Sequence, residues 1–176
     1  MIAELYADGG VIASNPSMIG GTYAWRLVYA DGREIGQAKA ISMTVMGLPV
    51  TNNQTELLAL LAGMTRLPAD FAGTIYSDSQ VTLGRVFMGW KWGHVPGWMH
   101  RIYQTQRSKF TRWHEIKYVL LDGHPTKAQL RAGIGKRGHP VSIHNVWCDE
   151  ACRQAAEDFM AAIGQNIPTS EMAVMA

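Results

Sequence analysis

Residues 51–68 read TNNQTELLALLAGMTRLP and hold the clearest helical pattern of the 176-residue chain. Their apolar side chains recur at intervals of three and four, which is the spacing of one helix face; the series is Leu57, Leu60, Leu61 and Met64. Thr51 and Asn52 offer N-cap chemistry, and Pro68 ends the pattern. The stretch therefore predicts a helix that is buried on one face, with Glu56 at the border of that face.

Five strands are predicted around this helix from apolar runs that are bounded by turn residues. They cover residues 2–8, 20–30, 33–45, 72–77 and 115–121. Asp31-Gly32 suits a hairpin turn between the second and third strands. The fifth run is almost wholly apolar, so we expect it in the centre of the sheet.

Three further helices are predicted, over residues 79–88, 100–112 and 145–163. Residues 122–143 lack an apolar period and are interpreted as one long loop. The order of these elements predicts an α/β (mixed α+β) domain over residues 1–163, with a mixed sheet covered by helices. Residues 164–176 lack periodicity and are predicted to be a flexible C-terminal tail.

The composition, with 47% hydrophobic and 17% charged residues, excludes a wholly disordered chain. No apolar run approaches the ~20 residues of a membrane span, and the start MIAELYADGG is unlike a secretory signal. The two cysteines, Cys148 and Cys152, are too few for a disulfide framework and are interpreted as core thiols. We therefore expect a cytoplasmic protein that does not use a membrane.

Basic residues are concentrated in one part of the chain. From Arg85 to Arg137 the sequence holds 11 Lys and Arg residues against two acids, although the formal charge of the whole chain is only +2. This asymmetry favours a surface that binds a polyanion and a separate acidic site. The alternative is an ordinary solvated surface on which basic residues cluster.

Four carboxylates stand where acids are unexpected: Asp8, Glu56, Asp78 and Asp149. Taken singly, each has an ordinary explanation as a strand-end or helix-start residue. A mixed sheet of this order, however, places the first and fourth strands side by side and brings their acids together. Converging carboxylates repel one another unless a cation neutralises them. The set therefore predicts an oxygen-ligated site for two hard ions, Mg²⁺ or Mn²⁺.

Four segments resemble, in order, the four motifs of the type 1 ribonucleases H. They are LYADGG (5–10), TNNQTELLALLAGM (51–64), IYSDSQ (75–80) and HNVWCDEA (144–151), and the resemblance covers residues 1–160. It implies a five-stranded mixed sheet, three antiparallel strands followed by two parallel ones, flanked by helices. It also implies an endoribonuclease that hydrolyses the RNA strand of RNA–DNA hybrids and leaves 5′-phosphate and 3′-hydroxyl ends.

The resemblance gives each carboxylate an expected role. Asp8 would bridge two Mg²⁺ ions, for which Mn²⁺ can substitute. Glu56 and Asp78 would hold the ion on the leaving-group side, and Asp149 would support the ion that carries the attacking water. His124, directly after the last strand, would match the family's mobile histidine, which assists proton transfer or product release. Because the long loop contains a second Gly-His-Pro, His139 is the alternative for that role.

RNA differs from DNA in its 2′-hydroxyl, and the family reads this group from the minor groove. The matching contact residues here are Asn15, Asn52, Asn53 and Gln80, and Thr51 resembles a contact to a DNA phosphate. The alternative reading makes Asn52 an N-cap and Asn53 an ordinary residue of the first helical turn.

Two basic segments have expected roles in binding nucleic acid. Residues 89–110 match the protrusion with which the family binds the DNA strand, although at least one tryptophan of Trp90, Trp92 and Trp98 is expected to anchor it to the core. The long loop carries four cations that typical members lack: Lys127, Arg131, Lys136 and Arg137. We interpret this loop as a flexible electrostatic tether; the alternative is an insertion that points into solvent.

The sequence thus favours a hybrid-specific endoribonuclease that acts as a monomer. One alternative is a nuclease of the same superfold that acts on DNA or junctions, against which the set of 2′-hydroxyl contacts argues. Another is a non-catalytic module that binds hybrids, against which the intact set of four acids argues.

Overall fold

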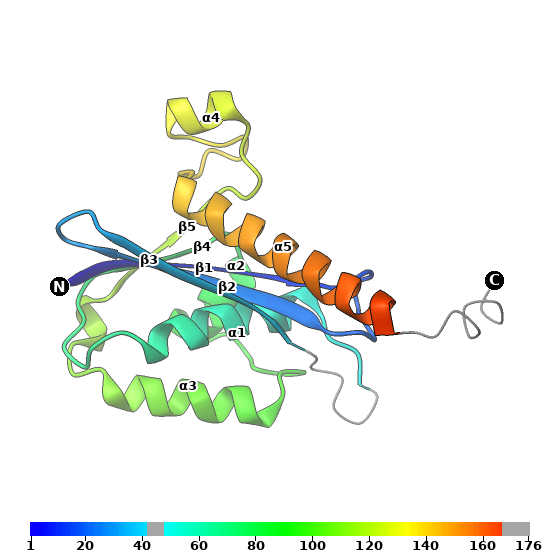
Figure 1. The fold of residues 1–176 in the computed structure, drawn as a ribbon. Coiled ribbons are helices and arrows are strands. Elements are labelled where there is room, and N and C mark those ends of the chain that lie inside the picture. Colours follow the sequence, from blue (N-terminus) through cyan, green and yellow to red (C-terminus); the bar gives the residue numbers. More distant parts are fainter. Residues whose placement is uncertain (42–47, 167–176) are drawn as a thin grey trace.

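The computed structural model describes residues 1–41 and 48–166, and these residues build one five-stranded mixed sheet with the strand order β3-β2-β1-β4-β5 (Figure 1). The strands are β1 (Ile2–Val11), β2 (Gly21–Tyr29), β3 (Glu34–Ile41), β4 (Thr74–Ser77) and β5 (Lys117–Leu120). β1, β2 and β3 are antiparallel neighbours, whereas β4 pairs with β1, and β5 with β4, in parallel. The predicted fold class is confirmed.

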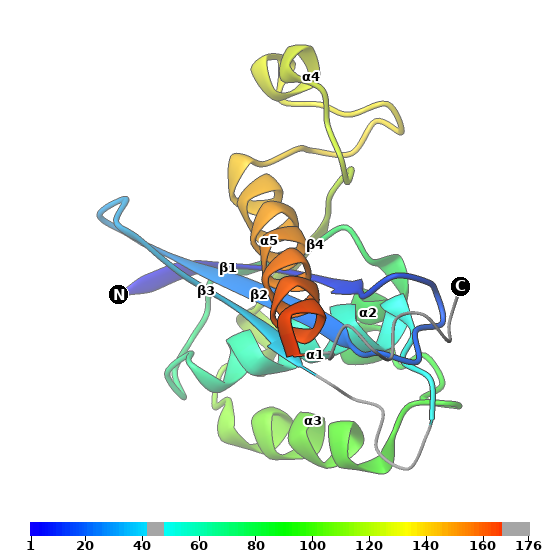
Figure 2. The same cartoon turned by 45° about the vertical axis from the view of Figure 1, so that its right-hand side comes forward.

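Helices cover both faces of the sheet. In the described residues they are α1 (Asn52–Thr65), α2 (Gln80–Phe87), α3 (Gly97–Lys109), α4 (Lys127–Ala132) and α5 (Ile143–Asn166), with a short 3-10 turn at Trp113–Glu115. α1 and α3 lie on one face and α5 crosses the other, while α4 projects from the body beyond the start of α5 (Figure 1, Figure 2). No helix within residues 1–41 and 48–166 is long and apolar enough to cross a membrane.

The predicted apolar face of α1 is the centre of the larger core. Leu57, Leu60 and Leu61 are fully buried and belong to one cluster with Leu5 of β1 and Ile75 of β4. Burying a leucine side chain stabilises the fold by about 1.5–3 kcal/mol. This cluster therefore fixes the position of α1 on β1, which contains Asp8, and on β4, which Asp78 follows.

A smaller core lies between the sheet and α5. Cys148 and Cys152 are buried there as free thiols, together with Tyr6 of β1. Burial raises the pKa of Cys148 well above its usual value, which keeps the thiol protonated and makes it a poor metal ligand. The interpretation of the two cysteines as core thiols is confirmed.

β1 is longer than predicted, because Gly9 and Gly10 continue the strand to Val11 and do not end it. A Cβ added at Gly9 would lie 2.2 Å from the backbone carbonyl carbon of Thr55 in α1. Glycine at this position therefore lets the helix backbone touch the strand. This close approach seats Glu56, the next residue of α1, beside the end of β1.

The fifth predicted strand is an edge strand, and its predicted place in the centre of the sheet is wrong. Lys117 and Tyr118 of β5 are exposed, and the two most buried apolar residues of the run, Ile116 and Leu121, flank the strand on either side. Tyr118 stacks on Phe87 of α2, with ring centroids 4.8 Å apart. The apolar run is therefore explained by a helix that packs on one side of an edge strand. Hydrophobicity alone does not distinguish such a strand from one in the centre of the sheet.

The predicted loop over residues 122–143 contains α4, so the interpretation of this segment as structureless is wrong. Thr126 and Gln129 form a capping box at the start of α4, and Gly133 ends the helix in the left-handed conformation, with φ of 73°. The helix has six residues, which is too short for an apolar period to appear in the sequence. The cap residues were the available signal.

The bounds of α3 and α5 also differ from the prediction. α3 begins at Gly97, three residues early, because Pro96 suits the position before a helix and does not break it. α5 extends to Asn166, past the predicted helix end at residue 163. Residues 42–45 of the third predicted strand and residues 167–176 of the predicted tail lie outside the described residues.

Substitution of Gly9 tests the close approach of α1 to β1. We expect Gly9→Ala to lower the free energy of unfolding by about 2–3 kcal/mol, because the added methyl group meets helix backbone that cannot rotate away. Gly93→Ala is the control, since a Cβ there meets no heavy atom within 4 Å in the described part of the chain. That variant should change stability by less than about 0.5 kcal/mol. Urea denaturation measures both, and equal effects of the two substitutions would contradict the close approach.

Candidate active site

The strand order brings Asp8 and Asp78 to the same end of the sheet. β1 and β4 are parallel neighbours, and Tyr6 pairs with Tyr76 in their register. Each acid stands two residues beyond that pair, Asp8 within β1 and Asp78 directly after β4. Glu56 approaches from α1, on the face of the sheet that α1 and α3 cover.

The fourth acid, Asp149, comes from α5 on the opposite face. Cys152, one turn further along α5, donates a hydrogen bond from Sγ to the carbonyl oxygen of Asp8 (3.4 Å). Residues three apart on a helix share a face. The buried thiol therefore fastens α5 to β1 at the point where Asp149 reaches the other acids.

Asp8 is the centre of this carboxylate cluster. Its side chain is almost wholly buried, and its pKa is raised well above the usual value, first by burial and then by the negative charge of Asp78. Asp149 and Glu56 raise it further. A hydrogen bond from the Gly9 N–H to Oδ1 (2.7 Å) acts in the opposite direction. The four predicted acids thus interact through their charges, although they come from four elements.

The ionised forms of the neighbouring acids, Glu56 and Asp78, are also disfavoured, because their pKa values are raised. Burial raises the pKa of Glu56 to about 7, against a hydrogen bond from the Ser79 side chain, and the charge of Asp78 adds to the rise. The pKa of Asp78 is also raised, mainly by burial, although His124 and a hydrogen bond from the Asn145 side chain oppose the rise. Both acids therefore favour protonation or a nearby cation.

Ser79 and Asn145 are site residues that the sequence reasoning missed. Ser79 is also the N-cap of α2, where its hydroxyl accepts a hydrogen bond from Thr82 N–H (3.2 Å). Asn145 is 3% exposed in the first turn of α5. Ser79 directly follows Asp78, and Asn145 lies four residues before Asp149. Both residues lie inside the quoted motifs, so their position in the motif was the signal that could have identified them.

The donor set fits a hard divalent cation. Carboxylate oxygens are its preferred ligands, and a cation would relieve the desolvation and repulsion that raise these pKa values. Asn145 Oδ1 adds a buried oxygen without a hydrogen-bond partner among the described residues. Within residues 1–41 and 48–166, no three His, Cys, Asp or Glu side chains are close enough to form a ready-made metal site. The four acids therefore interact through their charges in this structure but are not arranged as a preformed coordination shell.

His124 stands next to the carboxylates, and His139 does not. The Nδ1 atom of His124 lies 3.3 Å from Asp149 Oδ2, and the imidazole is 78% exposed. The carbonyl oxygen of His139 accepts a hydrogen bond from Gly135 N–H (2.9 Å), at the base of the segment that contains α4, where the following Pro140 accepts from Asp122 N–H (2.9 Å). Geometry therefore favours His124 as the histidine of this site.

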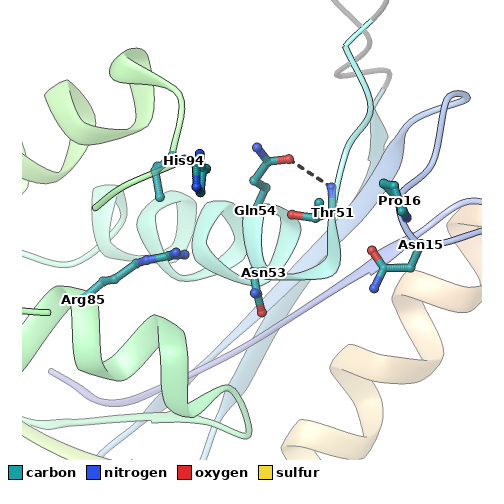
Figure 3. A pocket seen from close by; sticks show the side chains of 8 residues that line it. Asn15, Pro16, Thr51, Asn53, Gln54, Arg85 and His94 are labelled. Atoms are coloured by element: carbon teal, nitrogen blue, oxygen red, sulfur yellow. Dashed lines mark hydrogen bonds between the residues drawn. The ribbon is translucent and has the colours of Figure 1, made fainter. Parts of the chain in front are cut away.

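Three of the predicted substrate contacts line one hollow of about 390 Å³ (Figure 3). They are Asn15, Thr51 and Asn53, and they share the hollow with Pro16, Gln54, Arg85, His94 and Val95. Figure 3 shows Arg85 of α2 extending toward Asn53. Arg85 and His94 were not singled out in the sequence, because their approach to α1 depends on how α2 and the following loop pack.

The two remaining predicted contacts, Asn52 and Gln80, do not line this hollow. Asn52 N–H donates to Asn15 Oδ1 (3.2 Å), so the loop after β1 is tied to the start of α1. The N-cap is Thr51, whose N–H donates to Gln54 Oε1 (2.9 Å) in a capping box. The alternative reading of Asn52 as the N-cap is therefore wrong. Gln80 begins α2 and is exposed.

The chain has similar proteins among curated sequences and among solved structures. No family model matches the chain. A ribonuclease H of Aeromonas salmonicida is 31% identical over 87% of this chain and 88% of the relative. The chain belongs to the type 1 ribonuclease H family. A ribonuclease HI of Synechocystis sp. is 26% identical, covering 82% of this chain and 81% of its own length. The chain is thus an enzyme of the ribonuclease H family.

Solved ribonuclease H structures share the fold. The N-terminal ribonuclease H domain of a Mycobacterium tuberculosis protein superposes with a TM-score of 0.59 at 20% identity, over 92% of this chain and 99% of that one. LC11-RNase H1, solved in complex with an RNA/DNA hybrid, gives a TM-score of 0.60 at 17% identity, over 91% and 99% of the two chains.

The segment that matches the basic protrusion of the ribonucleases H is partly anchored by its aromatic residues. Trp92 packs against the larger core, with its ring 4.7 Å from that of Tyr103 in α3. Trp90 and Trp98 remain 42% and 39% exposed. The expectation that at least one tryptophan anchors the protrusion is confirmed, and two others present aromatic surface to solvent.

The pKa of Glu56 predicts how the stability of this ribonuclease H depends on pH. Between the ordinary pKa of 4.5 and the folded value of about 7, the folded protein binds more protons than the unfolded chain. Stability therefore falls as pH rises through this window and is constant above it. In EDTA we expect Glu56 to contribute a fall of up to about 3 kcal/mol in the free energy of unfolding.

Urea titrations across this window measure the effect. Glu56→Gln should remove most of the contribution, so that its stability curve is flatter than that of the unmodified protein. Glu157→Gln, an exposed acid on α5, is the control and should keep the full slope. Parallel curves for the two variants would contradict a raised Glu56 pKa.

Proposed function

We propose that the protein is an endonuclease that hydrolyses the RNA strand of RNA–DNA hybrids and leaves 5′-phosphate and 3′-hydroxyl ends. The observation that carries the proposal is the buried, mutually repelling carboxylate cluster around Asp8. The curated relatives named ribonuclease H support the reaction class, and the hybrid bound to LC11-RNase H1 supports the substrate class. The sequence-based expectations of a monomer that acts in the cytoplasm belong to the same proposal.

The carboxylates would hold two Mg²⁺ ions, with Mn²⁺ as a substitute. The ligands would be Asp8, Glu56, Asp78 and Asp149. When bound, such ions lower the pKa of water and stabilise the charge on the attacking and leaving oxygens. The raised pKa values support this assignment, because a cation would remove the repulsion that causes part of them.

The chain's own polar groups would orient these ligands and move protons. Hydrogen bonds from Ser79 and Asn145 restrain the carboxylates of Glu56 and Asp78. We assign to His124 the transfer of a proton between the site and solvent, supported by its 3.3 Å approach to Asp149 and by its exposed ring. A histidine suits this task because its pKa lies near neutral pH.

Selection of RNA would use the amide side chains near the start of α1 and α2. Asn53 lines the hollow of Figure 3, Asn15 is tied to Asn52, and Gln80 is exposed beside Asp78. Amides can donate to or accept from the 2′-hydroxyl, which duplex DNA lacks. Thr51 would contact a phosphate of the DNA strand, and Arg85 adds a cation to the same hollow.

One assay separates this function from a DNA-cutting nuclease and from a non-catalytic binding module. Labelled RNA–DNA hybrid, duplex RNA and duplex DNA are each incubated with Mg²⁺, with Mn²⁺ or with EDTA. We expect cleavage of the hybrid's RNA strand in either metal and none in EDTA. Cleavage of duplex DNA would favour the first alternative, and binding without cleavage would favour the second.

Neutralising the central acid tests the catalytic cluster. Asp8→Asn should lower cleavage by at least about 10³-fold, while hybrid binding stays within a few-fold, because phosphate contacts elsewhere supply most of the affinity. The metal-free protein should become slightly more stable, since one repelling charge is removed. Asp70→Asn, an exposed acid at the opposite end of the sheet, is the control. Near-normal turnover by Asp8→Asn would refute the cluster as the catalytic centre.

Removing two amides tests how RNA is selected. The double variant Asn53→Ala and Gln80→Ala should reduce the preference for hybrid over duplex DNA by about tenfold or more, with a smaller change in affinity for duplex DNA. Binding titrations with both duplexes, in EDTA, measure the ratio. An equal fall in affinity for hybrid and for duplex DNA would contradict this role, because it would show that the two residues do not contact the 2′-hydroxyl.

A further inference from the structure

Residues 123–142, which we call the basic finger, leave the body after β5 and return to the start of α5. The finger contains α4, which projects away from the sheet (Figure 1, Figure 2). Every residue of α4 keeps part of its surface exposed, so the finger adds little to either core. Its ordered shape therefore needs an explanation other than stabilisation of the fold.

The finger is built as a defined element. Thr126 N–H donates to Gln129 Oε1 (2.8 Å), and Gln129 N–H donates to Thr126 Oγ1 (3.2 Å). An isolated β-bridge joins Ile134 to Pro140 and closes the base of the finger. A helix of this length is not stable alone in water, so the attachment at the base is what holds it.

An ion pair between the partly exposed Arg137 and the buried Asp122 fastens that base to the end of β5. Arg137 Nε donates to Asp122 Oδ1 (2.6 Å), and Arg137 N–H donates to Asp122 Oδ2 (2.7 Å). Asp122 is 3% exposed, and a Cβ added at Gly135 would lie 2.2 Å from its Oδ2. Although burial opposes ionisation, these bonds lower the pKa of Asp122. The flexible tether expected from the sequence is therefore wrong in two respects: the segment is ordered, and Arg137 is already paired.

Three other cations of the finger stay available to a partner. Lys127, Arg131 and Lys136 are exposed, and none of them forms an ion pair with any residue of the described chain. Residues 123–142 contain no Asp or Glu. None of these three cations is thus paired with an acid of the carboxylate cluster.

The two ends of the finger fix its place relative to the proposed reaction. It starts at Gly123, next to His124, and it ends at Ser142, three residues before Asn145. His124 Nδ1 lies 3.3 Å from Asp149 Oδ2. A Cβ added at Gly123 would lie 2.3 Å from Asp78 Oδ2, so the first end lies within the carboxylate cluster. The second end continues directly into α5, which carries Asp149. A polyanion that lies across the cluster therefore passes the finger.

We propose that the basic finger is a preformed docking arm for the phosphate backbone of the substrate duplex, which Lys127, Arg131 and Lys136 contact beside the cut site. This inference rests on the proposed function, because it takes its partner to be the duplex that crosses the carboxylates. The arm adds affinity without reading sequence, since phosphates are the same along any strand. Because the finger is ordered before binding, docking costs little conformational entropy.

Matched charge variants test the arm. One variant carries Lys127→Gln, Arg131→Gln and Lys136→Gln, and the control carries Arg33→Gln, Arg66→Gln and Arg112→Gln. The control cations are exposed in the β2–β3 turn, at the end of α1 and after α3, and their removal changes the net charge by the same amount. Hybrid binding is titrated in EDTA over a range of salt concentrations, with melting curves to confirm that both variants are folded.

We expect the finger variant to bind hybrid about tenfold more weakly than the control variant at low salt. The slope of log affinity against log salt should become shallower by up to about 2.7, which corresponds to about 0.9 for each phosphate that a lysine or arginine no longer neutralises. Equal slopes and affinities for the two variants would overturn the arm and leave the finger as a solvent-facing insertion or a surface for another partner. Cleavage of hybrid by the unmodified protein is measured in parallel, so failure of the proposed function is seen separately.

A charge-neutral variant tests whether the arm is preformed. Gly135→Ala should displace the finger from Asp122 while it keeps every cation. We expect weaker hybrid binding with a salt slope no shallower than that of the unmodified protein, because Lys127, Arg131 and Lys136 are all present but must be ordered on binding. Binding equal to that of the unmodified protein, in a variant whose finger has become protease-sensitive, would overturn preorganisation.

Discussion

The close packing of α1 on β1 is the constraint on which the rest of the structure depends. Gly9 allows the backbone of α1 to touch the strand, and Leu57, Leu60 and Leu61 hold the helix there by burial. Glu56, between these two sets of contacts, is thereby carried to Asp8. One helix thus supplies both the centre of the core and one wall of the carboxylate cluster, so the energy of core packing is what keeps repelling acids together.

Two buried acids, one within β1 and one directly after β5, show two ways in which the cost of burying a carboxylate is met. Asp122 is paired by Arg137, and its pKa is lowered despite burial. Asp8 has other carboxylates for neighbours, and its pKa is raised. A buried acid with a cationic partner from the chain acts as a fastening, here of the basic finger. A buried acid without one is a site that a cation from solution would stabilise.

The errors of the sequence analysis share one cause, which is that burial depends on neighbours from distant parts of the chain. The apolar run of β5 was assigned to the centre of the sheet, yet α2 covers one side of an edge strand. The first predicted strand ends at residue 8, yet β1 continues through Gly9, where a helix backbone makes contact. α4 was missed because six residues are too few to show a period, and its attachment through Arg137 spans 15 residues.

The sequence by itself determined the elements whose signals are local: the periodic face of α1, the order of strands and helices, and the four motifs with their acids. Parallel pairing of β1 with β4 followed from that order, and with it the neighbourhood of Asp8 and Asp78. Only the tertiary structure decided which polar groups lie beside the acids, as Ser79 and Asn145 do. It also decided which cations have an ion-pair partner among the described residues, as Arg137 does and Lys127 does not. The physical reason is that hydrogen bonds, ion pairs and desolvation act over a few ångströms between segments that are far apart in sequence, where periodicity carries no information.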